Sequence, residues 1–225
     1  MEIVVKILLI IHVVSGAVAL LAALLAMSLR KGAQQHNFVG RIYFWAMMSV
    51  AATALPVSIA RPNVMLFFVA LFSAYMAYGG WRFAKRDRYQ RDRSPYLEWG
   101  MLFVGIAMVA YGLSQVLGTD PMGWVLVAFG GIGIQFAVQD IRGWQKNEDF
   151  ASRAINHLTH MLGGTIATVT AVLVQQVVPR LGEHNQFAVV VWLGPTVVLT
   201  PLIFVWANHV ARTKSVRLFH GMKKQ

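Results

Sequence analysis

The chain has 225 residues, of which 57% are hydrophobic and only 13% are charged. A soluble domain carries about 25% charged residues, and a soluble fold this apolar would expose large hydrophobic patches. The absence of cysteine excludes disulfides, thiolate metal sites and a cysteine nucleophile. The net charge of +11 lies mainly between apolar runs, so we attribute it to membrane topology and not to nucleic-acid binding.

Seven apolar runs follow one another along the chain, most of them close to the length of about 20 residues that a membrane-spanning helix needs. They cover residues 5–29, 42–60, 63–83, 99–117, 122–139, 154–178 and 186–210. Only Arg61 and Pro62 separate the second and third runs, which predicts a tight helical hairpin. We therefore predict an all-α integral membrane bundle of about seven transmembrane helices, forming a single domain over residues 1–225.

The distribution of basic residues predicts the orientation of this bundle. If the gaps between runs alternate between the two sides of the membrane, 17 of the 20 lysines and arginines fall on one side. They are Arg30, Lys31, Arg41, Arg82, Lys85, Arg86, Arg88, Arg91, Arg93, Arg142, Lys146, Arg153, Arg212, Lys214, Arg217, Lys223 and Lys224. Cytoplasmic loops are enriched in these residues. We expect the N-terminus outside, the C-terminus in the cytoplasm, and a multi-pass protein of the bacterial cytoplasmic membrane with the lipid bilayer as its partner.

Ionisable residues inside the runs are the candidates for chemistry, because placing them in hydrocarbon is costly. His12, Asp140, His157 and His160 stand out, and His36 is expected in the first cytoplasmic gap. From the helical rise, His12 lies about 7 Å to the outer side of the midplane and His157 about 13 Å to the inner side. These two histidines therefore belong to different sites.

Two ligand sets are compatible with these residues. His157 and His160 are spaced i, i+3 on one helix face, and Asp140 ends the preceding run, so His157, His160 and Asp140 are candidate ligands of a metal such as zinc. Alternatively, His12, His36 and His157 are candidate cofactor ligands, with haem b held axially between helices. The competing interpretation is structural, since histidines in a bundle often only hydrogen-bond a neighbouring helix.

Several motifs are similar to those of a known family. They are His12-x3-Gly16, Lys31-Gly32-x3-His36-x3-Gly40-Arg41 followed by Tyr43 and Met47, His157-x3-Met161, Ile166-Ala167-x2-Thr170-Ala171, and Trp192-x2-Pro195-x5-Pro201. Together they resemble a bacterial family of multi-pass membrane proteins of unknown function. The resemblance implies a bundle of about seven helices without an established activity. It places His12, His36 and His157 at motif positions, whereas His160 stands where the family more often has arginine or another polar residue.

Several functions remain open from the sequence, and whether the protein is an enzyme is undecided. The first is a histidine-ligated haem or redox protein that exchanges electrons with quinone. The second is a transporter or channel for a small solute or protons, for which glycine-rich and proline-containing spans are typical. The third is a non-catalytic accessory or sensory protein. A zinc-dependent hydrolase ranks last, because the sequence shows no nucleophile or general-base motif.

Overall fold

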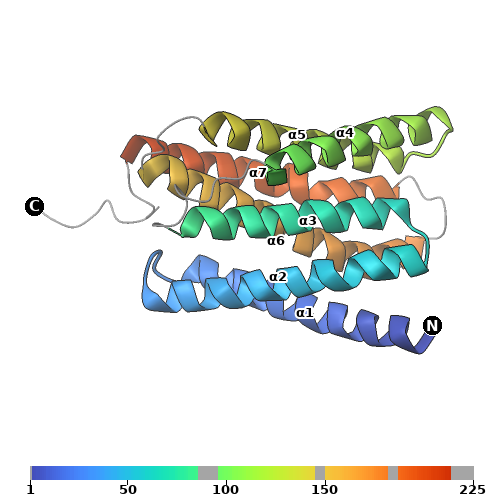
Figure 1. Ribbon diagram of the computed structural model, residues 1–225, viewed down its shortest axis with the longest axis horizontal. Coiled ribbons are helices and arrows are strands. Elements are labelled where there is room, and N and C mark those ends of the chain that lie inside the picture. The colour runs from blue at the N-terminus through green and yellow to red at the C-terminus, as the bar shows by residue number, and fades with distance from the viewer. Residues whose placement is uncertain (1, 86–95, 145–149, 182–186, 214–225) are drawn as a thin grey trace, which may run out of the picture.

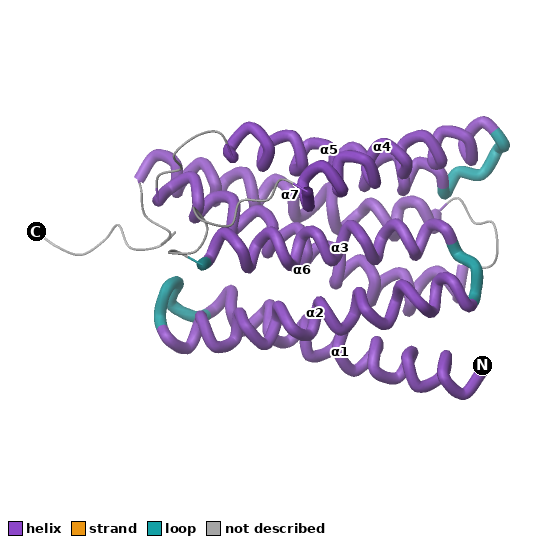
Figure 2. The backbone as a smooth tube through the Cα atoms, in the orientation of Figure 1, coloured by secondary structure: helices purple, strands orange, loops and turns teal. Residues whose placement is uncertain are grey.

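The computed structural model describes residues 2–85, 96–144, 150–181 and 187–213. These residues form seven α-helices, each long and apolar enough to cross a membrane. Their bounds are α1 Glu2–Ser28, α2 Gln34–Ala60, α3 Val64–Ala84, α4 Tyr96–Leu117, α5 Gly123–Trp144, α6 Phe150–Leu181 and α7 Phe187–Thr213. Figure 1 shows successive helices running in alternating directions along the long axis, and Figure 2 shows the short connections that join several of them. The predicted all-α fold with seven spans is confirmed.

The helices extend beyond the apolar runs that predicted them, and in two of them the extension changes the position of a candidate site residue. Helix α2 begins at Gln34 and not at residue 42, so His36 lies in a helix and not in the connecting gap as expected. Helix α5 continues to Trp144, which places Asp140 inside the helix and not at its end. Hydropathy reports the part of a helix that contacts lipid, whereas backbone hydrogen bonding continues into the polar turns that follow.

The hairpin between α2 and α3 has the tight geometry that the sequence predicts. The backbone N–H of Arg61 donates to the carbonyl of Val57 at 2.8 Å and closes the end of α2. The side chain of Asn63 then accepts from the backbone N–H of Leu66 at 3.0 Å. This is an N-cap, which satisfies one of the free donors of the first turn of α3.

Helix α3 lies between two apolar clusters. On one side it packs with α4, α5 and α7 around Met76, Met108 and Leu126, whose exposed fractions are at most 2%. On the other side Ala77 packs against α1 and α2. Small side chains on α1, including Ala19 and Ala22, line this second contact and let the helices approach closely. Through α3, all seven helices form one connected bundle.

The outer surface of the bundle is apolar. Side chains such as Ile10, Phe103 and Val197 are more than 60% exposed, which fits contact with lipid and not with water. The chain therefore has the structure expected of a multi-pass membrane protein. We call the end where α1, α3, α5 and α7 finish the C-terminal end (left in Figure 1), and the other the opposite end.

Candidate functional site

Two histidines from distant parts of the sequence meet near the C-terminal end of the bundle. His36 lies in the first turn of α2, and His157 lies about two turns into α6. Their ring centroids are 6.4 Å apart, and their ring planes are nearly perpendicular, at 84°. Two imidazoles are thus placed side by side within a mainly apolar bundle.

Each of these two rings is oriented by a backbone carbonyl. Nδ1 of His36 donates to the carbonyl oxygen of Ala26 at 3.1 Å, and Nδ1 of His157 donates to that of Gly80 at 2.7 Å. A carbonyl oxygen can only accept, so Nδ1 carries the hydrogen and the other nitrogen of a neutral ring keeps its lone pair. Among the described residues, neither Nε2 atom has a hydrogen-bond partner. Both rings are therefore in the tautomer that binds a metal through Nε2.

A lysine lies beside this histidine pair. The Lys31 ammonium group donates to the carbonyl oxygens of Ala26 and Met27 at 2.8 and 2.6 Å, where it caps the end of α1. It lies 5.3 Å from the ring centroid of Trp206. Partial burial lowers the pKa of Lys31. Its charge also acts on His36 and His157, so it is the nearby cation of this pair.

Two consecutive glycines of α3 allow α6 to approach closely enough to place its histidines. A Cβ on Gly79 would lie 2.6 Å from Cδ2 of His160, and one on Gly80 would lie 2.8 Å from Cγ of Met161. Both distances are shorter than any ordinary carbon–carbon contact. The missing side chains also leave the carbonyl of Gly80 accessible to His157.

A second polar cluster, formed by Tyr75, Asp140 and His160, lies deeper in the bundle. The hydroxyl of Tyr75 donates to Oδ2 of Asp140 at 2.5 Å, and Nε2 of His160 lies 3.0 Å from the same oxygen. Nδ1 of His160 donates to the carbonyl of Asn156 at 2.9 Å. The residue exposures of Asp140 and His160 are 3% and 1%. We call these three side chains the carboxylate cluster.

A buried ion pair adjoins the carboxylate cluster on its C-terminal side. Arg82, in the last turn of α3, forms an ion pair with Glu98, in the first turn of α4. Glu98 is only 3% exposed. Tyr75 lies within the electrostatic range of both charges. Four helices thus contribute ionisable side chains to one polar region.

His12 lies far from both groups. Its Nδ1 donates to the carbonyl of Val50 at 3.1 Å and lies 3.2 Å from Oγ1 of Thr53, so it links α1 to α2. It precedes Ala26, the partner of His36, by fourteen positions on α1, which corresponds to about 21 Å. His12 therefore does not share a site with His36 and His157.

The three residues predicted to bind a metal are divided between two places. Asp140 and His160 are in contact, whereas His157 lies beside His36. Within the described part of the chain, no group of three histidine or acidic side chains is close enough to hold a metal ion. The structure thus joins Asp140 to His160 and His36 to His157, and leaves His12 apart.

Sequence reasoning missed four contributors to these sites. Tyr75 reads as an ordinary apolar position, Arg82 as a loop charge, and Glu98 falls just before the predicted start of the fourth span. Nothing in the sequence distinguishes Gly79 from the other glycines of the chain. The signal that could have found Glu98 is its position one turn from a spanning run, facing the basic end of α3.

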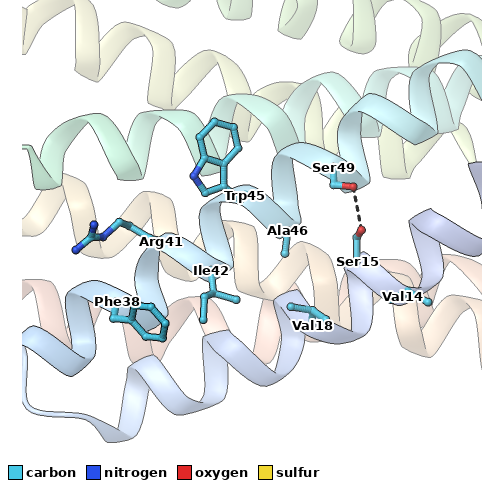
Figure 3. A pocket seen from close by; sticks show the side chains of 9 residues that line it. All are labelled: Val14, Ser15, Val18, Phe38, Arg41, Ile42, Trp45, Ala46 and Ser49. Carbon is cyan, nitrogen blue, oxygen red and sulfur yellow. Dashed lines mark hydrogen bonds between the residues drawn. The ribbon is translucent and has the colours of Figure 1, made fainter.

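A groove of about 550 Å³ opens between α1 and α2 on the outer face (Figure 3). Its lining is almost entirely apolar, apart from Arg41 and the hydrogen-bonded pair Ser15 and Ser49, whose oxygens are 2.9 Å apart. Trp45 beside it is 68% exposed. The groove contains none of the histidines or buried acids, so the histidine pair and the carboxylate cluster lie elsewhere.

Comparison of the chain with protein-family models, with curated proteins and with solved structures found no match.

Proposed function

We propose that this protein is a multi-pass membrane redox protein that holds haem b between His36 and His157, near a C-terminal end that faces the cytoplasm. The observation that carries the proposal is the spacing of the two rings, whose centroids are 6.4 Å apart. An imidazole nitrogen binds a metal at about 2 Å and the ring centre lies about 1 Å further, so axial histidines have centres about 6 Å apart.

The donor set distinguishes haem iron from zinc. A zinc site in a protein uses at least three protein ligands, whereas the described residues offer two imidazoles here and no third histidine or acid. Two neutral imidazoles, one from α2 and one from α6, would serve as the protein ligands of haem iron. Both Nδ1–H groups already donate to backbone carbonyls, which leaves Nε2 of each ring as the nitrogen that would bind the iron.

The surrounding side chains fit the same cofactor. Lys31 supplies a cation near both rings, which would pair with the carboxylates of a porphyrin. The stacked rings of Phe44 and Trp81, whose centroids are 4.7 Å apart, add flat apolar surface between α2 and α3. Haem bound here would supply one-electron transfer at the inner side of the membrane, with quinone as the expected partner.

The test is the absorption spectrum of the protein purified from haem-supplied cells. We expect a Soret band that is lost in His36→Ala and in His157→Ala but kept in His12→Ala, since His12 is a matched intramembrane histidine outside the pair. Circular dichroism and size-exclusion chromatography of each variant separate loss of cofactor from loss of fold. A colourless wild-type protein, or a band that survives both substitutions in the pair, would overturn the proposal.

The resemblance of the histidine motifs to a bacterial membrane-protein family supports the same choice of residues. His36 and His157 both stand at motif positions. We propose membership of that family together with this cofactor site, and assign the transport and accessory alternatives a lower rank because neither explains why two imidazoles lie side by side.

A further inference from the structure

In the carboxylate cluster, two side chains approach the same oxygen of Asp140, which is more than a contact between two helices requires. Oδ2 of Asp140 is approached both by the Tyr75 hydroxyl and by Nε2 of His160, at 2.5 and 3.0 Å. The rings of Phe83, Phe136 and Tyr75 surround the imidazole, with centroids 4.7 to 5.7 Å from it. An acid and a base are thus in direct contact in a place from which water is excluded.

The number of protons in this contact follows from the partner of the other ring nitrogen. The carbonyl of Asn156 can only accept, so Nδ1 of His160 carries a hydrogen. If Asp140 were ionised and the ring neutral, two lone pairs would face each other at 3.0 Å and repel. A hydrogen bond therefore requires one proton between Oδ2 and Nε2, whether it resides on the carboxyl or on the ring.

We propose that Asp140 and His160 form a proton-binding site, whose hydrogen-bond geometry fits the state in which one proton is bound. The loaded pair has no net charge, either as carboxylic acid with imidazole or as carboxylate with imidazolium. When the proton leaves to water at the C-terminal end, the pair acquires a charge of −1 in a buried position. Such a charge is costly, so the site holds its proton firmly. This inference does not depend on haem.

Tyr75 controls how firmly the proton is held. Its hydroxyl donates to the oxygen that bears the negative charge after the proton has left. A hydrogen bond to an ionised group is stronger than one to a neutral group, so Tyr75 stabilises the empty state. Tyr75 is therefore a positioning residue, which eases release of the proton from the pair.

The ion pair of Arg82 and Glu98 lies on the side from which protons would arrive. Both residues lie within one turn of the C-terminal end. Oε2 of Glu98 is buried and receives no hydrogen bond from the described residues, so it has lone pairs available for a proton. His157 is a further titratable neighbour, one turn earlier on α6, with His36 behind it. Arg142 on α5 and Arg153 on α6 are the nearest basic residues along the helices that carry Asp140 and His160.

Buried apolar side chains pack around the carboxylate cluster. Met76, Met101 and Phe129 belong to the same apolar core cluster as Tyr75.

Nuclear magnetic resonance of the full chain in lipid nanodiscs, with ¹⁵N-labelled histidine, tests this assignment. His160→Gln identifies the signals of His160. In the wild type we expect Nδ1 to be protonated throughout and Nε2 to share a proton at neutral pH, then to lose it in one alkaline step. Asp140→Asn abolishes that step, whereas Asp120→Asn, which changes an exposed acid in the α4–α5 connection, leaves it unchanged.

Tyr75→Phe provides a second test, in which the measured quantity is the pH at which Nε2 of His160 loses its proton. If Tyr75 had only a structural role, its substitution would not move this pH upward. Loss of the donor to the carboxylate moves the step to higher pH by about 1–2 units. If Asp140→Asn fails to fold, this shift carries the test alone. The proposal is overturned if Nε2 of wild-type His160 has a bare lone pair at neutral pH, if its signal does not respond to Asp140→Asn, or if Tyr75→Phe moves no step.

Discussion

All four described histidines of the first, second and sixth helices direct Nδ1 at a backbone carbonyl. The group that lies near the other ring nitrogen determines which chemistry each histidine can support. The acceptors belong to Val50, Ala26, Gly80 and Asn156. In each ring the remaining nitrogen, Nε2, is the reactive atom. At His160 it contacts a carboxyl group, which suits the proposed proton site. At His36 and His157 the nearest aromatic ring is the other imidazole, with centroids 6.4 Å apart, which suits the proposed haem site.

At the residue scale, the ion pair between Arg82 and Glu98 gives a stability prediction. Arg82→Met leaves the buried Glu98 carboxylate without its cation, and breaking a buried pair in this way costs about 3 kcal/mol. The double variant Arg82→Met/Glu98→Gln removes the buried charge and should recover part of that loss. Unfolding in detergent, followed by circular dichroism, measures both. Equal stability of Arg82→Met and wild type would show that the pair is solvated.

At the scale of helices, the contact between α3 and α6 places most of the functional side chains. Its closeness depends on Gly79 and Gly80, because any larger side chain would meet His160 or Met161. The same contact brings the carbonyl of Gly80 to His157 and orients Tyr75 toward Asp140. The two sites are therefore products of one helix–helix interface.

Gly79→Ala tests this interface. The new Cβ would lie 2.6 Å from a ring whose two nitrogens are both engaged, so the ring cannot move without losing a hydrogen bond. We expect a loss of about 1–3 kcal/mol, as for other overpacked cores. Gly131→Ala on α5 is the matched control, since its Cβ would meet nothing within 4 Å. Thermal unfolding should therefore separate the two variants, and equal melting temperatures would contradict the packing.

The helices could be predicted from the sequence to a large extent because hydropathy reports lipid contact directly. For the same reason, hydropathy could not predict helical turns and site residues that are polar. The polar first turns of α2, including His36, lack an apolar signal although they are helical. Glu98 resembles a loop residue until α3 is placed beside α4. The contact between Asp140 and His160 depends on which helices are neighbours, and the spacing of residues along one chain does not contain that information.

For the molecule as a whole, the uneven distribution of basic residues between the two ends indicates how the bundle is oriented in the membrane. Arg30 and Lys31 follow α1 at the C-terminal end, whereas Lys6, Arg61 and Arg180 are the basic residues at the opposite end. On the basis of the positive-inside rule, we propose that the C-terminal end faces the cytoplasm. Both the histidine pair and the entrance to the carboxylate cluster would then face the cytoplasmic leaflet.

The absence of native cysteine makes this orientation directly measurable. Gln34→Cys and Arg61→Cys each introduce one exposed thiol, at the C-terminal end and the opposite end respectively. In intact cells, a membrane-impermeant maleimide should label the cysteine at position 61 and not the one at position 34, which should react only after permeabilisation. The reverse pattern would place the C-terminal end outside and contradict the assigned topology.

The most direct measurement of the central claim is electron paramagnetic resonance of the oxidised, haem-loaded protein. Two imidazoles on one iron produce a low-spin ferric signal, and ring planes at 84° predict the strongly anisotropic form of that signal. His36→Ala and His157→Ala should each convert it to high spin or abolish it. A high-spin signal in the wild type, or a low-spin signal that persists without His36, would contradict a haem held between these two histidines.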